Sequence, residues 1–96
     1  MEFKQKVYNI CKQIPKGKVT TYKIIAEKLN TKAYQAVGNA LRKNPYKEVP
    51  CHRVVKSNGE VGGFRGSKDN KEKARLLIKE GLEIKNNKIK DKFIQL

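Results

Sequence analysis

Apolar residues recur every three or four positions through the first part of the chain. The stripe consists of Phe3, Val7, Ile10, Cys11 and Ile14. This spacing places the side chains on one face of a helix, so residues 3–14 are predicted to form a helix that packs against the core. Cys11 lies within the stripe and is interpreted as a packing residue, because nothing near it in the sequence would lower its pKa.

Two shorter helical patterns follow, separated by a tight polar turn. Residues 23–29 and residues 33–43 each carry an apolar face. Thr20 or Thr21 can cap the first of these helices through its hydroxyl, and Thr31 can cap the second. Two short helices joined in this way predict a helix-turn-helix, in which the second helix is the recognition element.

The second half of the chain mixes extended and helical patterns. Residues 49–55 are predicted to be partly extended, and residues 69–80 to form a last helix that Gly81 ends. Its inward residues are predicted to be Ala74, Leu77 and Ile78. Apolar and polar residues then alternate on both sides of Asn86-Asn87, which predicts a terminal hairpin. The expected fold is mainly α: a small winged-helix-like helix-turn-helix domain with short β elements and a C-terminal hairpin.

The predicted recognition helix is rich in small residues. Gly38 costs up to about 1 kcal/mol of helix propensity relative to alanine. Two interpretations stay open. A small face lets another helix pack closely, or a thin helix approaches a narrow groove while Lys32, Arg42 and Lys43 contact phosphates.

Charge favours the second interpretation. The 96 residues contain 23 Lys and Arg against 9 Asp and Glu, a formal net charge of +14. Such an excess indicates a polyanionic partner, with nucleic acid ahead of an anionic membrane, since the chain shows no long apolar run and no basic amphipathic helix with an aromatic face. Heat-adapted surfaces are also lysine-rich, but they usually raise both signs of charge.

Other features restrict the remaining classes. The first residues lack the apolar core of a signal peptide, so we expect an intracellular protein, cytoplasmic or associated with the nucleoid. Two cysteines and one histidine are too few for a closed zinc site, and no metal or cofactor is expected. The glycine-rich stretch at 61–66 lacks the spacing of a phosphate-binding loop.

The candidate chemistry lies at Cys51-His52. A cysteine beside a histidine is compatible with thiol chemistry, but also with a small buried residue next to a structural histidine. The surrounding residues decide between these. Residues 50–55 (PCHRVV), 57–59 (SNG) and 61–64 (VGGF) resemble the active-site signature of alkylguanine-DNA alkyltransferases, the methylated-DNA–protein-cysteine methyltransferases. The similarity continues at 17–19, 21–22, 36–38, 40, 42, 44–45 and 80–81, and so covers nearly the whole chain.

The resemblance implies direct DNA repair. A protein of this family binds duplex DNA in the minor groove, flips out a 6-O-alkylguanine and transfers the alkyl group irreversibly to its own cysteine, here Cys51. By resemblance, Glu80 orients His52, which deprotonates a water that takes the proton of Cys51. On an extended chain neighbouring side chains point opposite ways, which leaves room for that water.

The resemblance also assigns residues to the site. Tyr22 assists rotation of the nucleotide, Asn44 supports the site, and the backbone N–H of Arg65 donates to the 6-O atom. The alkylguanine pocket is expected to comprise Leu41, Val54, Phe64 and Arg65. The DNA-contacting residues are expected to be Thr21, Tyr22, Lys32, Tyr34, Gln35, Ala36, Gly38, Asn39, Arg42 and Ser57. The expected partner is double-stranded DNA, bound by a monomer without an obligate protein partner.

Several residues depart from the family pattern. Gln35 stands where many relatives insert an arginine into the base stack, so the charge and planar stacking of arginine are lost, and Tyr34 beside it offers aromatic stacking instead. Phe64 replaces a common tyrosine. Family members usually carry an N-terminal α/β domain, whereas residues 1–96 are interpreted as one DNA-binding alkyltransferase domain.

Three other functions make different predictions. An alkyltransferase-like sensor would flip the base and recruit repair proteins, but such relatives typically lack the cysteine. An ordinary helix-turn-helix regulator would bind DNA whether or not it is alkylated. A Cys-His hydrolase would have no use for the basic charge.

Overall fold

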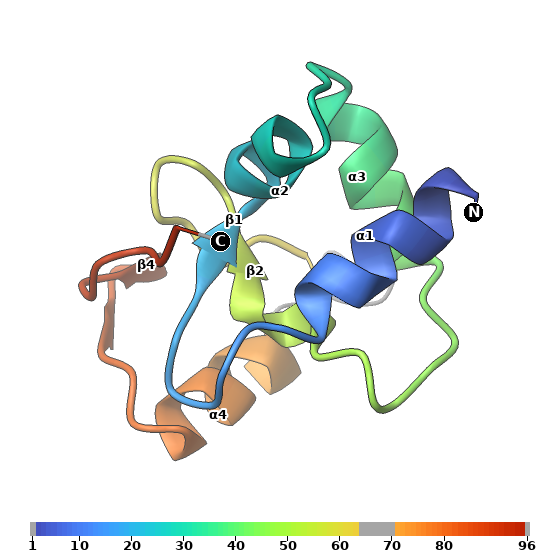
Figure 1. Cartoon of the computed structure of the whole chain (residues 1–96). Helices are drawn as coiled ribbons and strands as arrows, with labels where there is room; N and C mark the ends of the chain where they lie inside the picture. Colours follow the sequence, from blue (N-terminus) through green and yellow to red (C-terminus); the bar gives the residue numbers. More distant parts are fainter. Residues whose placement is uncertain (1, 64–70, 96) are drawn as a thin grey trace.

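The computed structural model describes residues 2–63 and 71–95. Within them the elements are α1 (Phe3–Cys11), β1 (Thr20–Thr21), α2 (Tyr22–Lys28), α3 (Tyr34–Arg42), the 3-10 helix η1 (Cys51–Arg53), β2 (Val54–Val55), α4 (Lys71–Lys79), β3 (Ile84–Lys85) and β4 (Lys88–Ile89). In Figure 1, α2 and α3 lie at the top, α4 lies at the bottom, and β1 and β2 lie between them. The predicted mainly α fold with short β elements is confirmed.

Helix α1 follows the predicted stripe but is shorter than predicted. Val7, Ile10 and Cys11 are buried, whereas Phe3 is 37% exposed. After Cys11 the chain tightens, because the N–H of Ile14 donates to the carbonyl of Cys11 three residues back rather than four. Ile14 therefore stays in the core although it lies beyond the helix.

The helix-turn-helix is formed by α2 and α3. The hydroxyl of Thr21 accepts from the N–H of Ile24 at 3.1 Å and caps α2, as predicted. Before α3 the hydroxyl of Thr31 accepts from the N–H of Ala33 at 3.1 Å. The N-cap of α3 is Ala33, and no side chain caps this helix. The predicted cap by Thr31 is therefore wrong, and its hydroxyl bonds within the turn before α3 instead.

A parallel ladder that the sequence did not predict joins the two halves of the chain. Thr20 pairs with Val54 and Thr21 with Val55. On the C-terminal side, the N–H of Ile94 donates to the carbonyl of Val19 at 2.9 Å, and the hydroxyl of Thr20 donates to the carbonyl of Ile94 at 3.2 Å. The strand that leads into the helix-turn-helix is thereby fixed to the segment that follows Cys51.

The two valines of β2 point into different apolar clusters. Val54 packs in a cluster built mainly from α1, α2 and α3, whereas Val55 packs in a second cluster with Val61 and Leu77. Successive side chains of a strand face opposite sides, so a two-residue strand is enough to serve both clusters.

Helix α4 presents a different face from the one predicted. Ile78, predicted to point inward, is 57% exposed, while Lys73 is only 1% exposed. Lys73 and Leu77 are four residues apart and share one face, whereas Ile78 is rotated by about 100° from Leu77. The prediction for Ile78 was therefore wrong, and a lysine occupies the buried face.

The C-terminal hairpin is confirmed. Ile84 pairs with Ile89 and Lys85 with Lys88 in antiparallel register. Asn86 and Asn87 adopt φ values of 53° and 63°, the left-handed conformation that a two-residue hairpin turn requires. Among the described helices, none is long and apolar enough to cross a membrane.

Candidate active site

Cys51 opens the 3-10 helix η1 at the junction of the chain's two halves. It is 6% exposed and belongs to the cluster that also contains Val37 and Leu41 of α3. Its N–H donates to the carbonyl of Val49 at 2.8 Å. Cys51 is thus buried against the helices of the helix-turn-helix.

The backbone at Cys51 is not extended, as the interpretation of Cys51 and His52 had assumed. Residues 51–53 are helical rather than extended, because the N–H of Arg53 donates to the carbonyl of Pro50 at 2.9 Å. Successive side chains of a 3-10 helix are about 120° apart. The argument that Cys51 and His52 point to opposite sides of an extended chain is therefore wrong, and the two side chains diverge by a helical step instead.

His52 is oriented by Glu80, which lies just beyond the end of α4. Nε2 of His52 lies 2.9 Å from Oε2 of Glu80. Burial by itself raises the pKa of Glu80, but hydrogen bonds from Arg53 and His52 outweigh it and lower that pKa to about 2. The carboxylate is therefore ionised and can only accept, so Nε2 carries the hydrogen and Nδ1 of a neutral ring keeps a free lone pair.

Burial also keeps the His52 ring uncharged. It is the largest cause that lowers the pKa of His52 below its ordinary 6.5, and the hydrogen bond and charge of Glu80 act in the opposite direction. The charges of Arg53 and Lys73 lower the pKa further. A neutral imidazole with a free nitrogen can serve as a general base.

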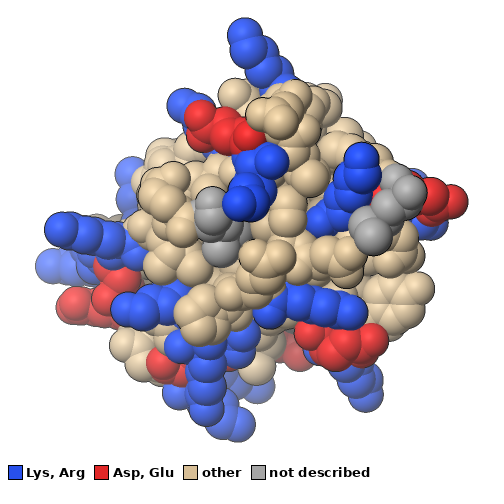
Figure 2. Space-filling view, in the orientation of Figure 1, with Lys and Arg blue, Asp and Glu red and all other residues tan. Residues whose placement is uncertain are grey.

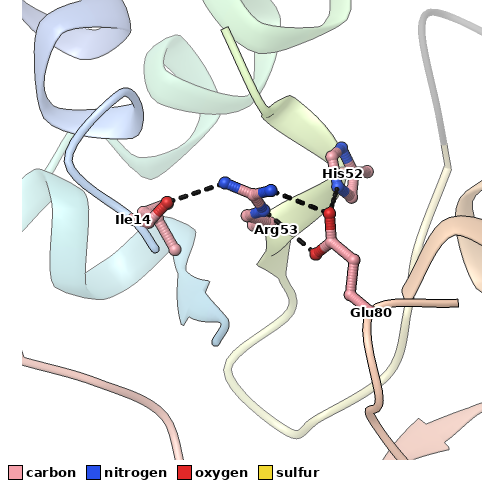
Figure 3. Close-up of polar contacts among 4 residues, drawn as sticks. All are labelled: Ile14, His52, Arg53 and Glu80. Carbon is pink, nitrogen blue, oxygen red and sulfur yellow. Dashed lines mark hydrogen bonds and ion pairs between the residues drawn. The ribbon is translucent and has the colours of Figure 1, made fainter. Parts of the chain in front are cut away.

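Arg53 holds the same carboxylate from the other side. Its Nε donates to Oε1 of Glu80 at 3.0 Å and its Nη2 to Oε2 at 2.8 Å. Its Nη1 donates to the carbonyl of Ile14 at 2.8 Å. Figure 3 shows Arg53 between Ile14 and Glu80, with His52 on the far side of the carboxylate.

The backbone of Glu80 is also closely packed. Gly17, in the turn after α1, has a φ of +84°, and a Cβ there would lie 3.2 Å from the carbonyl oxygen of Glu80. A side chain at this position would be strained and would press on the residue that orients His52.

Tyr22 of α2 packs against the cluster that contains Cys51, and Lys73 of α4 lies over the Tyr22 ring. Nζ of Lys73 lies 5.8 Å from the centre of the Tyr22 ring and donates to the carbonyl of Gly63 at 3.2 Å. Burial raises the pKa of Tyr22 to about 12, so its hydroxyl stays protonated and able to donate. Burial lowers the pKa of Lys73 to about 8, against the opposing effect of Cys51 and Cys11.

Asn44 shapes the loop that leads to Cys51. Its Nδ2 donates to the carbonyl of Val49 at 3.2 Å, and its Oδ1 accepts from the N–H of Tyr46 at 2.9 Å. A buried side chain thus bridges the end of α3 and the residue two before the cysteine. The structure thus places Asn44 between α3 and the loop that leads to Cys51.

The other cysteine lies fully in the core. Cys11 is buried on α1, and neither it nor Cys51 forms a disulfide. Burial raises the pKa of the Cys11 thiol to about 12. Because the thiolate is the reactive form of cysteine, Cys11 is inert at neutral pH.

Most of the predicted DNA-contacting side chains lie on the helix-turn-helix. Lys32, Tyr34, Gln35, Asn39 and Arg42 are exposed, Ala36 and Gly38 are partly exposed, and Ser57 is exposed in the turn after β2. Thr21 differs, because it is buried and its hydroxyl caps α2. Leu41 and Val54 lie in the core beside Cys51. Phe64 and Arg65 lie outside the described residues.

Two small residues of α3, Ala40 and Gly38, have different surroundings. The hydroxyl of Tyr8 on α1 donates to the backbone carbonyl of Ala40 at 2.7 Å, so α1 and α3 are in contact at this residue. A groove of about 670 Å³ lies beside this contact, between α1 and α3. At Gly38, by contrast, an added Cβ would meet nothing within 4 Å. Gly38 therefore faces open space, which agrees with a helix kept thin for an external partner.

Arg53 and Lys73 belong to the site although neither was predicted from the sequence. Arg53 was noted only as part of the signature, without a role of its own. An arginine next to Cys-His could nevertheless have been expected to pair with the carboxylate of Glu80. No comparable signal marks Lys73, because lysine is rarely fully buried and its charge places it on the outer face of a helix.

Comparison with known proteins places this fold and site in one class. The chain belongs to the family described as 6-O-methylguanine DNA methyltransferase, DNA binding domain, whose model matches residues 2–82. It is 47% identical over 83 residues to a methylated-DNA–protein-cysteine methyltransferase of Saccharolobus islandicus. The aligned region covers 85% of this chain and 52% of that protein. The chain thus spans about half the length of this curated relative.

Solved structures agree with the family. The fold is similar to that of O6-methylguanine-DNA methyltransferase from Pyrococcus kodakaraensis, with a TM-score of 0.74, 42% identity, and coverage of 85% of this chain and 47% of that one. It is also similar to S. pombe Atl1 in complex with damaged DNA containing O6-carboxymethylguanine. That match has a TM-score of 0.77, 35% identity, and coverage of 86% of this chain and 79% of that one.

Proposed function

We propose that this chain repairs DNA by transferring the alkyl group of a 6-O-alkylguanine to its own Cys51. The observation that carries the proposal is the hydrogen bond from His52 to the ionised Glu80, directly beside the cysteine of the family signature. A nucleophile, an adjacent base and a third group that orients the base form a recognisable unit for activating a thiol. The homologous methyltransferases support the reaction class.

Cys51 is activated through a water molecule in this proposal. Nδ1 of His52 takes a proton from that water as the water takes the proton of the thiol, and Glu80 stabilises the resulting imidazolium. The 3-10 step between Cys51 and His52 turns the ring away from the sulfur, which favours a relay through water over direct contact.

The transfer itself is a single displacement. A bond forms between Sγ of Cys51 and the alkyl carbon while the bond from that carbon to the guanine 6-O atom breaks. Its electrons stay on the guanine, which takes up one proton to replace the one that the thiol lost. The thioether is stable, so each molecule acts once, and no cofactor is needed because the acceptor is part of the chain.

DNA is bound through the exposed face of α3, and the guanine leaves the stack to reach Cys51, since its 6-O atom is inaccessible inside the duplex. Tyr22, at the start of α2, helps to rotate the nucleotide and donates from its protonated hydroxyl. Figure 2 shows Lys and Arg side chains projecting on several sides of the molecule. Together with the net charge of +14, they provide sequence-independent attraction to phosphates.

A second function competes with this one. The chain covers 79% of S. pombe Atl1, whose structure contains DNA with O6-carboxymethylguanine, and this similarity supports binding of alkylated guanine. A protein with that function alone would act as a sensor and leave the alkyl group in place. The cysteine at position 51 favours transfer. The two functions differ in one observable, because a sensor would release DNA that still carries its alkyl group.

Peptide mass mapping after incubation with a 6-O-methylguanine duplex tests the proposal. We expect one methyl group on the peptide that contains Cys51 and none on the peptide that contains Cys11. Cys51→Ser should abolish methyl uptake, whereas Cys11→Ala should retain it. Binding of the methylated duplex with no methyl on Cys51 would support the sensor instead.

A further inference from the structure

We infer that Arg53 is a positioning residue for the proposed reaction: it fixes the Glu80 carboxylate against His52 and offsets the negative charge of that carboxylate. This inference rests on the proposed function, because it concerns how His52 is prepared to act as the base. Arg53 has no assigned part in the scheme above, in which the proton moves from Cys51 through water to His52.

The geometry supports a clamp rather than a loose ion pair. Two parallel N–H groups of Arg53 reach both oxygens of Glu80, at 3.0 and 2.8 Å. The side chains are 16% and 10% exposed. Bidentate, charge-assisted pairs of this kind fix the plane of a carboxylate as well as its distance. Oε2 then has a single orientation from which to accept the hydrogen of Nε2 of His52.

The third contact of Arg53 anchors the clamp to the rest of the fold. Nη1 donates to the carbonyl of Ile14, a residue 39 positions away in the sequence and just beyond α1. The end of α1, the turn that carries Cys51 and the end of α4 therefore meet at one guanidinium (Figure 3). Lysine has a single point of charge on a flexible stem and cannot make three such contacts at fixed angles.

The charge of Arg53 has a separate consequence. An unpaired carboxylate beside a histidine favours the imidazolium form, which has no lone pair with which to take a proton. Within residues 2–63 and 71–95, the charged groups that act on His52 are Glu80, Arg53 and Lys73, and the two cations oppose the carboxylate. Because Arg53 also pairs with the Glu80 carboxylate, that carboxylate can orient the His52 ring while the ring stays neutral.

A purely structural part for Arg53 makes a different prediction. If Arg53 only tied α1 to α4, its removal would lower the free energy of unfolding but leave the titration of His52 unchanged. The two alternatives can therefore be separated by a measurement on the folded protein without DNA.

NMR titration of His52 provides that measurement, because it is the chain's only histidine and gives one assignable ring resonance. In Arg53→Met the pKa of His52 should rise by about one pH unit, and the acidic limb of the methyl-transfer rate should move to higher pH by the same amount. Arg53→Lys keeps the charge, so the pKa should return close to the wild-type value while the plateau rate stays below it. Arg75→Met removes an exposed arginine of α4 and should change neither.

An unchanged His52 pKa in folded Arg53→Met would overturn the inference, and thermal unfolding of each variant establishes that it is folded. If Arg53→Met does not fold, Arg53→Lys decides: a plateau rate equal to that of wild type would contradict the clamp. Failure of the proposed function gives a different result. Wild-type protein would then take up no methyl group, while the pKa of His52 would still differ between wild type and Arg53→Met.

Discussion

Nε2 of His52 lies 2.9 Å from Oε2 of Glu80, which joins the turn that carries Cys51 to the end of α4. The two residues are 28 positions apart, and only the tertiary fold brings them together. This contact defines the tautomer of His52 and makes Glu80 a structural as well as a chemical part of the site.

Glu80 should contribute to stability in a pH-dependent way. Its folded pKa of about 2 lies below the ordinary value of 4.5. The stabilisation is therefore complete above pH 4.5 and is lost as the pH falls from 4.5 towards 2. At neutral pH Glu80→Gln should lower the free energy of unfolding by about 2 kcal/mol, and this difference should shrink through the acidic range. Urea unfolding at a series of pH values measures it. Glu72→Gln, at an exposed position on α4, is the control, and a difference for Glu80→Gln that is constant with pH would contradict the account.

Tyr22→Phe should slow alkyl transfer more than it weakens DNA binding. The variant keeps the buried ring but loses the hydroxyl, which the raised pKa keeps protonated as a donor. We expect transfer to be slower by roughly tenfold or more, with the dissociation constant for the duplex nearly unchanged. Single-turnover rates and binding titrations give the two quantities. Tyr46→Phe, outside the helix-turn-helix, should behave as wild type, and an unchanged transfer rate in Tyr22→Phe would remove Tyr22 from the proposed role.

Lys73 should make the protein more stable as the pH rises above neutrality. Its folded pKa of about 8 lies below the ordinary 10.5, so the unfolded chain binds more protons between these values. Stability due to Lys73 should increase over this range, by up to about 1.4 kcal/mol per pH unit. Lys73→Met removes this dependence, so the difference between the two proteins should change with pH. Lys79→Met, at an exposed position on the same helix, is the control. If the free energies of unfolding of Lys73→Met and wild type change in parallel with pH, the account of Lys73 is contradicted.

Gln35 tests how the exposed face of α3 meets DNA. It stands in the first turn of α3, at the position where the resemblance to the family implies an inserted arginine. Gln35→Arg should tighten duplex binding and make the slope of log affinity against log salt steeper by the amount expected for about one added phosphate contact. Gln35→Ala should reduce the rate of alkyl transfer from a flipped base. Gln13→Arg adds the same charge outside the helix-turn-helix. Equal effects of the two arginine variants would show that only net charge matters.

Local signals predicted the parts of the fold that depend on neighbouring residues. The stripe through Val7 and Cys11, the Thr21 cap and the Asn86-Asn87 turn each follow from spacing or backbone preference. The Cys51-His52 pair stood out in the sequence itself, the resemblance to the family added Glu80 as the partner of His52, and the structure brings His52 and Glu80 into contact.

Apart from the 3-10 turn at residues 51–53, the main errors and omissions concern long-range contacts. Ile78 was assigned to the core because it is apolar, but tertiary packing turned α4 so that Lys73 fills that face. The pairing of β1 with β2 involves only two residues in each strand, too few for a periodic pattern. Arg53 reaches Ile14 across 39 positions, a contact that no local pattern encodes.

The most direct test of the central claim is the intact mass of the protein after incubation with excess 6-O-methylguanine duplex. The account predicts a gain of one methyl group per chain that reaches a plateau, no gain with unmodified DNA, and no gain in Cys51→Ser. An unchanged mass in wild-type protein that binds the methylated duplex would contradict it.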